Sequence, residues 1–126
     1  MRVYVAGPMT GYPDHNRAAF RKASALLRDE YGLEVLSPDE FDESHPLVNP
    51  QWADYLRRDL REGVLLVEAL VCLPGWRASR GALLEVTVAA ALGLLLYEFQ
   101  AEPGGGLGRL RELDRSEIPT PGMDTT

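Results

Sequence analysis

Four short apolar runs alternate with three longer amphipathic segments along the first hundred residues. The runs are Val3–Ala6, Leu33–Ser37, Ala69–Leu73 and Leu94–Phe99, and each has the length of a buried strand. Chains that alternate strand and helix fold through right-handed crossovers into a parallel sheet covered by helices on both faces. The sequence therefore predicts a small, doubly wound α/β domain of the Rossmann or flavodoxin type.

The three segments between these runs have the spacing of amphipathic helices. Asn16 is the expected cap of the first helix, which ends at Gly32. The second is expected from Pro50, with Asn49 as its cap, and the third over Gly81–Leu92. One face of each helix carries the residues Phe20, Ser24, Leu27 and Tyr31, then Trp52, Leu56, Leu60 and Val64, and finally Leu84, Val88 and Leu92.

The composition changes after about residue 100. We predict a domain over residues 1–100 and a Gly- and Pro-rich extension over 101–126, in which Leu107, Leu110 and Leu113 form one or two helical turns. The last dozen residues are expected to be mobile. The acidic run Asp39–Glu43 is predicted to be a solvated loop, with a lesser chance of contacting a ligand.

Composition limits the class of protein. With 126 residues, 45% of them apolar, the chain suits one folded domain. Cys72 is the single cysteine and is expected to be an inert core thiol, so neither a disulfide framework nor a zinc site is predicted, and a reducing cytoplasm is the expected compartment. No apolar run is long enough for a membrane span. A net charge of −6 argues against binding to duplex nucleic acid.

The loop after the first strand is the first candidate binding element. Ligands of parallel sheets bind beyond the carboxyl ends of the strands. Glycines there allow backbone N–H groups to approach an anion, and the following helix adds the positive end of its dipole. No complete phosphate-binding signature is present, so a plain turn remains an equal alternative. The candidate binding residues of this loop are Gly7, Pro8, Met9, Thr10 and Gly11.

The loop after the third strand leads into the third helix. Ser79 is the expected cap, and Gly81 leaves the helix start open to a ligand. Glu85 follows among apolar neighbours, where a carboxylate can act as a nucleophile toward an anomeric carbon, although compensation of the helix dipole is the simpler explanation. Trp76 either stacks on a base or plugs the loop.

Other polar residues have weaker signals. Asp59, in the second helix, points toward the candidate site or belongs to a solvated face paired with neighbouring arginines, and we favour the second interpretation on spacing alone. His15 and His45 lack the partners of a catalytic triad, and His15 is expected at most to touch the entrance of the site.

Taken together in their order, these residues resemble those of the nucleoside 2-deoxyribosyltransferase-like superfamily, most closely a branch of small domains of phages and bacteria. The resemblance covers roughly residues 2–98. It is carried by Val3–Gly11, Asn16, Arg17, Phe20, Asp59, Leu60, Leu73–Trp76, Ser79–Gly81 and Glu85.

The resemblance implies the chemistry of the site. Members cleave N-glycosidic bonds of deoxynucleosides or nucleoside 5′-monophosphates through a glutamate nucleophile, which corresponds to Glu85, and need neither metal nor other cofactor. Ser79 stands where the nucleotide hydrolases place a phosphate-binding serine. Asp59 matches an acidic residue near the sugar. The basic loop residue of the hydrolases is absent, and we expect Arg17 and Arg80 to supply that charge.

The resemblance also implies a homodimer or larger homo-oligomer, because in relatives a neighbouring subunit completes the site. The function predicted is an N-glycosidic bond hydrolase or transferase that acts on a nucleoside 5′-monophosphate or nucleoside through a covalent glutamyl-glycosyl intermediate. The alternative is a domain that binds or senses a nucleotide without turnover. The base, the sugar and the acceptor stay open.

Overall fold

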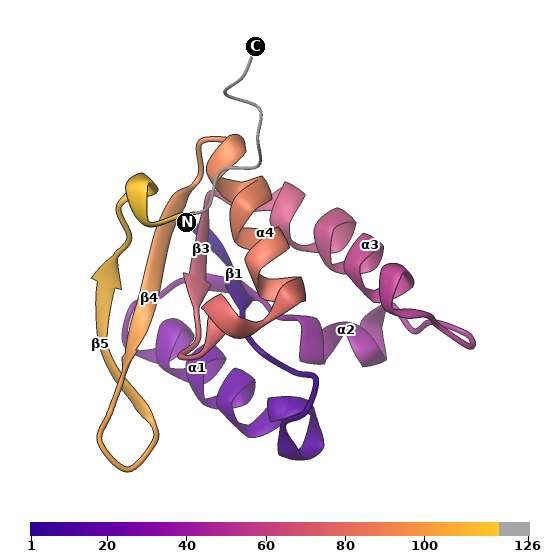
Figure 1. Ribbon diagram of the computed structural model, residues 1–126, viewed down its shortest axis with the longest axis horizontal. Helices are drawn as coiled ribbons and strands as arrows, with labels where there is room; N and C mark the ends of the chain where they lie inside the picture. The colour runs from indigo at the N-terminus through magenta and orange to yellow at the C-terminus, as the bar shows by residue number, and fades with distance from the viewer. Residues whose placement is uncertain (119–126) are drawn as a thin grey trace.

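A computed structural model describes residues 1–118 of the chain (Figure 1). Its strands and α-helices alternate as the sequence predicts over the first hundred residues. In chain order they are β1 (Arg2–Ala6), α1 (Arg17–Asp29), β2 (Glu34–Leu36), α2 (Pro38–Ser44), α3 (Trp52–Glu62), β3 (Ala69–Cys72), α4 (Arg80–Ala91), β4 (Leu95–Ala101) and β5 (Leu107–Glu112). Four short 3-10 helices are added at η1 (Pro13–Asn16), η2 (Val64–Leu66), η3 (Trp76–Ala78) and η4 (Arg115–Glu117).

The strands form a single sheet in the order β2-β1-β3-β4-β5. The first four are parallel, and β5 runs antiparallel to β4. Tyr4, in the inner strand β1, lies opposite Leu36 on one side and Leu70 on the other. The chain leaves β1 toward β2 on one side and leaves β3 toward β4 on the other, so the carboxyl ends of β1 and β3 are the place where such a sheet binds ligands.

Helices cover both faces of the sheet, which confirms the predicted fold class (Figure 1). On one face, Phe20 and Leu27 of α1 pack on Val3 and Val5. The other face carries the second core cluster, which includes Phe41 of α2, Val86 and Ala89 of α4, and Tyr4, Leu70 and Leu96 of the strands. Alternate residues of β1 therefore face different helices. Tyr4 is turned toward α2 and α4.

Helix starts differ from the prediction. Gln51, not Asn49, is the cap of α3, since it forms a capping box in which its side chain and that of Asp54 each accept a backbone N–H hydrogen bond. Asn16 precedes α1 but does not cap it with its side chain; its Nδ2 instead donates to the carbonyl of Pro8 at 3.0 Å. The run 39–43 is not a loop but most of α2, which begins with a proline and acidic residues, as helices often do.

The C-terminal segment also differs. Leu107 and Leu110 lie in strand β5, not in helical turns, because a turn over Gly104–Gly106, all three with positive φ, folds the chain back along β4. Residue 100, the expected domain boundary, lies inside β4, and Leu113 and Ile118 join the core. Of the dozen residues expected to be mobile, 115–118 are placed on the domain, and 119–126 lie outside the described residues.

Candidate active site

A cavity of about 860 Å³ opens at the carboxyl ends of β1 and β3. Its wall is built by the loop after β1, by α2 and α3, and by the start of α4. Gly7 begins the first loop where the backbone passes close to Leu73, since a Cβ on this glycine would lie 2.7 Å from the Leu73 side chain. The sequence-predicted residues in the lining are Gly7, Pro8, Met9, Thr10, Arg17, Asp59, Ser79, Arg80, Gly81 and Glu85.

Two predicted binding residues do not line this cavity. Gly11 is exposed in the turn before η1. Trp76 is 1% exposed and packs in the core, where its Nε1 donates a 2.9 Å hydrogen bond to Oε1 of Glu98. Its ring therefore plugs the loop and is not available to stack on a base. The aromatic residues that do line the cavity are Tyr12, Trp52 and Tyr55.

Glu85 is buried at 5% exposure in the lining of the cavity. It lies more than one turn into α4 and faces the sheet, where the hydroxyl of Tyr4 donates a 2.5 Å hydrogen bond to its Oε2. Burial, followed by the nearby charge of Asp59, raises the pKa of Glu85 to about 8, and the Tyr4 hydrogen bond acts in the opposite direction. The carboxyl group is therefore mostly protonated at neutral pH. Compensation of the helix dipole does not explain a carboxyl group held neutral in this way.

Asp59 lies on the buried side of α3, at 8% exposure, contrary to the solvated face that we favoured from its spacing. Burial raises its pKa to about 6, against the lowering effect of Arg58, whose Nε donates to Oδ1 of Asp59 at 3.1 Å. Since Asp59 in turn raises the pKa of Glu85, the two carboxyl groups titrate as a pair. Two carboxyl groups with raised pKa values in one cavity are a typical feature of acid–base sites.

The three arginines of the lining differ in their partners. Arg58, 2% exposed, is held by Asp59, by Asp42 at 3.1 Å and by the carbonyl of Pro38. Arg17 lies 3.5 Å from the same Asp42. Arg80 forms no ion pair within residues 1–118, and its guanidinium lies over the ring of Trp52, 4.0 Å from the ring centroid. Arg80 is thus the cation of this cavity that remains available to an anionic ligand.

The start of α4 adds hydrogen-bond donors to the same wall. Ser79 caps the helix as predicted, and its Oγ accepts from the N–H of Ala82 at 3.2 Å. The first intrahelical bond runs from Leu83 to the Ser79 carbonyl, so the N–H groups of Arg80 and Gly81 precede the helical ladder. Free N–H groups at a helix start, beside a cation, suit an anion such as a phosphate.

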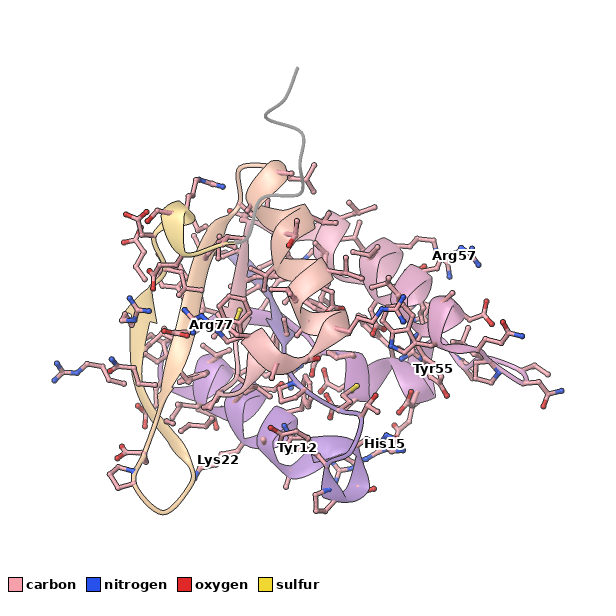
Figure 2. All side chains as sticks on the ribbon, in the orientation of Figure 1. Tyr12, His15, Lys22, Tyr55, Arg57 and Arg77 are labelled. Atoms are coloured by element: carbon pink, nitrogen blue, oxygen red, sulfur yellow. The ribbon has the colours of Figure 1, made fainter. Side chains whose placement is uncertain are left out.

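Side chains from two segments lie at the opening. Figure 2 shows Tyr12 and His15 on the segment after β1 and Tyr55 on α3, whereas Arg57, also on α3, points away from the domain. Tyr12, His15 and Tyr55 line the cavity and are each partly open to solvent. Glu85 and Asp59, which form the floor of the cavity, are buried, whereas the aromatic residues at its rim, Tyr12 and Tyr55, are exposed.

The sequence analysis missed two residues that control this floor. Tyr4 had a detectable signal, because a tyrosine inside a buried apolar strand needs a partner for its hydroxyl group. Arg58 had none. It is one of two adjacent arginines in a charged helix, and only the packing of α2 against α3 separates the buried Arg58 from the exposed Arg57. Asp42 and Trp52 likewise reach the lining through the packing of these two helices.

Within residues 1–118, no three His, Cys, Asp or Glu side chains lie close enough together to hold a metal ion. Nor does any helix of this part of the chain combine the length and the hydropathy of a membrane span. A comparison with family models matches residues 1–98 to a domain of unknown function, DUF4406. A comparison with curated proteins finds no match.

Proposed function

The chain belongs to the DUF4406 family, and we propose that it cleaves the N-glycosidic bond of a nucleoside 5′-monophosphate or nucleoside. One observation carries this proposal. Glu85 lies in the floor of a cavity of about 860 Å³, hydrogen-bonded to Tyr4 and electrostatically coupled to Asp59. A buried carboxyl pair beside a cavity is the arrangement that glycosidic chemistry uses. The resemblance to nucleoside 2-deoxyribosyltransferases supports the same assignment for Glu85.

The reaction begins with ionised Glu85. A carboxylate oxygen forms a bond to C1′ of the sugar while the bond from C1′ to the base nitrogen breaks, and its electron pair leaves with the base. Asp59 is the candidate donor of the proton that the departing base takes up. Water, or a second base, then attacks C1′ of the glycosyl ester, and the bond from C1′ to Glu85 breaks and releases the carboxylate. The proton of the attacking group passes to Asp59, which restores the starting state.

The pair must therefore hold one proton, and that proton must be on Asp59 when Glu85 attacks. In the free site Glu85 binds the proton more tightly, because its pKa is about 8 and that of Asp59 about 6. Because the charge of Asp59 contributes to the raised pKa of Glu85 and is absent once Asp59 holds the proton, moving the proton between them costs at most about 2–3 kcal/mol, at about 1.4 kcal/mol per pKa unit. This cost is small beside the barrier reductions of enzymes. The Tyr4 hydrogen bond reduces it by stabilising the Glu85 carboxylate.

A 5′-phosphate suits the start of α4. Arg80, the hydroxyl of Ser79 and the N–H group of Gly81 come from one segment of the lining and offer one cation and several donors. Base stacking on Trp52 or Tyr55 would take the place that we first expected of Trp76. The substrate class that this combination supports best is a nucleoside 5′-monophosphate.

We also propose that the protein is a homo-oligomer. Helix α4 is apolar on all sides, and its surface leaves Leu84 39% exposed, while Leu92, directly after it, is 54% exposed. A helix of this kind is usually covered. A second copy of the chain is the expected cover, as the resemblance implies. Light scattering of the purified protein should give a dimer or larger assembly, and a monomer at micromolar concentration would contradict this.

The test of the activity is release of free base. The protein is incubated with a panel of nucleosides and their 5′-monophosphates, and the products are separated by chromatography. Glu85→Gln keeps the shape and the hydrogen bond from Tyr4 but removes the nucleophile, so release should fall by at least about a thousandfold, the usual scale for loss of a nucleophile. Mass spectrometry of the quenched wild-type protein should show the added sugar on Glu85. Absence of base release from every substrate would refute the proposal.

The second candidate is a nucleotide-binding or sensing domain without turnover. The observation that favours it is the raised pKa of Glu85, which keeps the nucleophile neutral in the free site. This candidate predicts that a nucleoside monophosphate raises the melting temperature, as any ligand of the native state does, without release of base. The same effect in Glu85→Gln would agree with binding alone.

A further inference from the structure

One buried carboxylate connects two parts of the structure. They are the C-terminal hairpin, formed by β4 and β5, and the cavity loop, which runs from the end of β3 to the start of α4 and contains Trp76 and Ser79. Glu98 of β4 is 9% exposed. Its Oε1 accepts hydrogen bonds from Nε1 of Trp76 at 2.9 Å and from Arg77 at 3.2 Å. Its Oε2 accepts two hydrogen bonds from Arg111 of β5, at 3.0 and 2.5 Å. Figure 2 shows Arg77 beside β4. One carboxylate oxygen of Glu98 therefore accepts hydrogen bonds from the loop, and the other accepts them from β5 of the hairpin.

Glu117 completes a cluster of four charged side chains with Glu98, Arg77 and Arg111. It accepts from Arg111 at 2.8 Å and lies 3.5 Å from Arg77, so two arginines and two glutamates alternate around the cluster. A buried carboxylate depends on its partners, because removal of one leaves a charge that burial has separated from water. Without Arg111, Glu98 would keep only its two contacts with the loop and would have to move toward solvent.

Movement of Glu98 would reach the cavity in two steps. The ring nitrogen of Trp76 donates its hydrogen bond to Glu98. The backbone carbonyl of Trp76 accepts a 3.1 Å hydrogen bond from the N–H of Ser79. Ser79 in turn accepts the N–H of Ala82 on its hydroxyl and so defines where α4 begins. The position of the Trp76 ring therefore determines where Ser79 and its neighbour Arg80 meet the cavity.

We infer that Arg111 is a positioning residue of the site: it holds Glu98, which fixes Trp76 and, through it, the segment that carries Ser79 and Arg80. Arg111 and Glu117 lie beyond residue 98, where the match to the family ends. The hairpin β4–β5 is then a support for the loop between β3 and α4. Its effect on a phosphorylated substrate rests on the proposed function, but its effect on the loop does not.

The first experiment measures the loop without any substrate. Hydrogen exchange of the full chain is followed at the amides of Ser79 and Ala82 in Arg111→Gln and in Arg115→Gln. Arg115 is the matched control, because it also ties the C-terminal segment to the domain by two hydrogen bonds, to the carbonyls of Ala90 and Leu94, without touching the cluster. Exchange at the two amides should be at least about tenfold faster in Arg111→Gln than in the control.

Two further variants separate this effect from a general loss of stability. Trp76→Phe removes the donor to Glu98 together with part of the buried ring, so it should speed exchange at Ser79 at least as much. Arg111→Lys keeps the charge beside Glu98 and should restore part of the protection. Equal exchange at Ser79 in Arg111→Gln, in Arg115→Gln and in the unsubstituted protein would overturn the inference, whatever the activity.

The second experiment measures substrate preference. If the protein cleaves nucleotides, Arg111→Gln should lower kcat/KM for a nucleoside monophosphate about tenfold more than for the free nucleoside, mainly through KM, because Ser79 and Arg80 are the residues that we propose to bind the phosphate. An equal loss for both substrates would contradict a positioning role. If no substrate is cleaved, the proposed function fails, and the exchange experiment alone decides the role of Arg111.

Discussion

The hydroxyl group of Tyr4 donates a hydrogen bond of 2.5 Å to the carboxyl group of Glu85, although 81 positions separate them in the sequence. The hydrogen bond joins β1 to α4 at the floor of the cavity. It also favours the ionised form of Glu85 against burial and the charge of Asp59, both of which favour the protonated form. The balance of these three effects determines when this carboxyl group is charged.

Tyr4→Phe should therefore change the pH dependence of the reaction. The ring stays in place, but Glu85 loses the donor that stabilises its carboxylate, so its pKa rises further. Because a hydrogen bond to a charged group contributes about 1.5–3 kcal/mol, we expect kcat/KM at pH 7 to fall about 10- to 100-fold. The measurement is a pH profile for each protein. A profile that keeps the same alkaline limb in Tyr4→Phe would contradict the role of this hydrogen bond.

The unsubstituted protein should show a bell-shaped profile of kcat/KM. The productive state holds one proton on the carboxyl pair, so the rate should rise through the pKa of Asp59, about 6, and fall through that of Glu85, about 8. In Asp59→Asn only Glu85 titrates, and it must be ionised to attack, so the alkaline limb should disappear and a much lower rate should rise to a plateau through the pKa of Glu85. In the unsubstituted protein, a rate that continues to rise above pH 8 would show that the doubly ionised site is active and that Asp59 is not the proton donor.

Glu85→Gln should stabilise the protein at alkaline pH while it abolishes activity. The pKa of Glu85 is about 8 in the folded state, above its ordinary value of 4.5, so the native state binds this proton more tightly than the unfolded state. Its contribution to stability is therefore complete below about pH 4.5 and is lost as the pH rises to 8. The substituted glutamine does not ionise, so the free energy of unfolding should exceed that of the unsubstituted protein by up to about 5 kcal/mol at pH 9.

The measurement is denaturant unfolding of both proteins at pH 5 and pH 9. At pH 5 the two should differ little, because Glu85 is then neutral in the folded protein. A difference that is the same at both pH values would mean that the charge of Glu85 does not oppose folding.

Arg58→Met should destabilise the protein strongly. Arg58 is the buried partner of both Asp59 and Asp42, and removal of one member of a buried ion pair costs about 3–5 kcal/mol. Asp59 also loses the cation that lowers its pKa, so the acid limb of the rate profile should move upward. Arg57→Met on the exposed side of the same helix is the control, and its free energy of unfolding should change by less than about 0.5 kcal/mol. Equal effects of the two substitutions would contradict the burial of Arg58.

Arg80→Met should weaken the preference for phosphorylated substrates. Arg80 has no carboxylate partner within residues 1–118 and lies at the start of α4, so its charge is available to a phosphate. We expect kcat/KM for a nucleoside monophosphate to fall about 10- to 100-fold, and that for the nucleoside to change little. Methionine keeps contact with Trp52. The result would be contradicted if both substrates lost activity to the same extent.

Gly63→Ala should disturb the Tyr4–Glu85 hydrogen bond, because the added methyl group would push against the Tyr4 ring. A Cβ at Gly63 would lie 2.4 Å from the Tyr4 ring and 2.6 Å from the backbone oxygen of Asp59. Overpacking of this kind costs about 1–3 kcal/mol, and we expect a lower midpoint in denaturant together with reduced activity. Gly81→Ala is the control, since its Cβ would meet only Trp52, at 3.9 Å, and alanine favours a helix. Its stability should be unchanged or higher.

Local patterns predicted most of the fold. The continuous apolar character of Ala69–Leu73 and the glycine after Tyr31 are signals that neighbouring residues carry by themselves, and both led to correct elements. The prediction of helical turns at Leu107 and Leu110 was wrong. Their spacing fits a helix, but hydrogen bonding to β4 decides their conformation. The spacing of Trp52 and Leu56 likewise predicted an apolar face for α3, but its fully buried residues are Arg58 and Asp59.

The sequence by itself determined the order of the four parallel strands and of α1, α3 and α4, the place of the candidate site at the carboxyl ends of the strands, and the candidacy of Glu85, because hydrophobic period and turn residues act over short distances. Only the tertiary structure decided that Trp76 belongs to the core and that Arg58, Tyr4 and Asp59 surround the floor of the cavity. The physical reason is that burial and hydrogen-bond pairing, which set the charge of each group, arise between segments that only packing brings together.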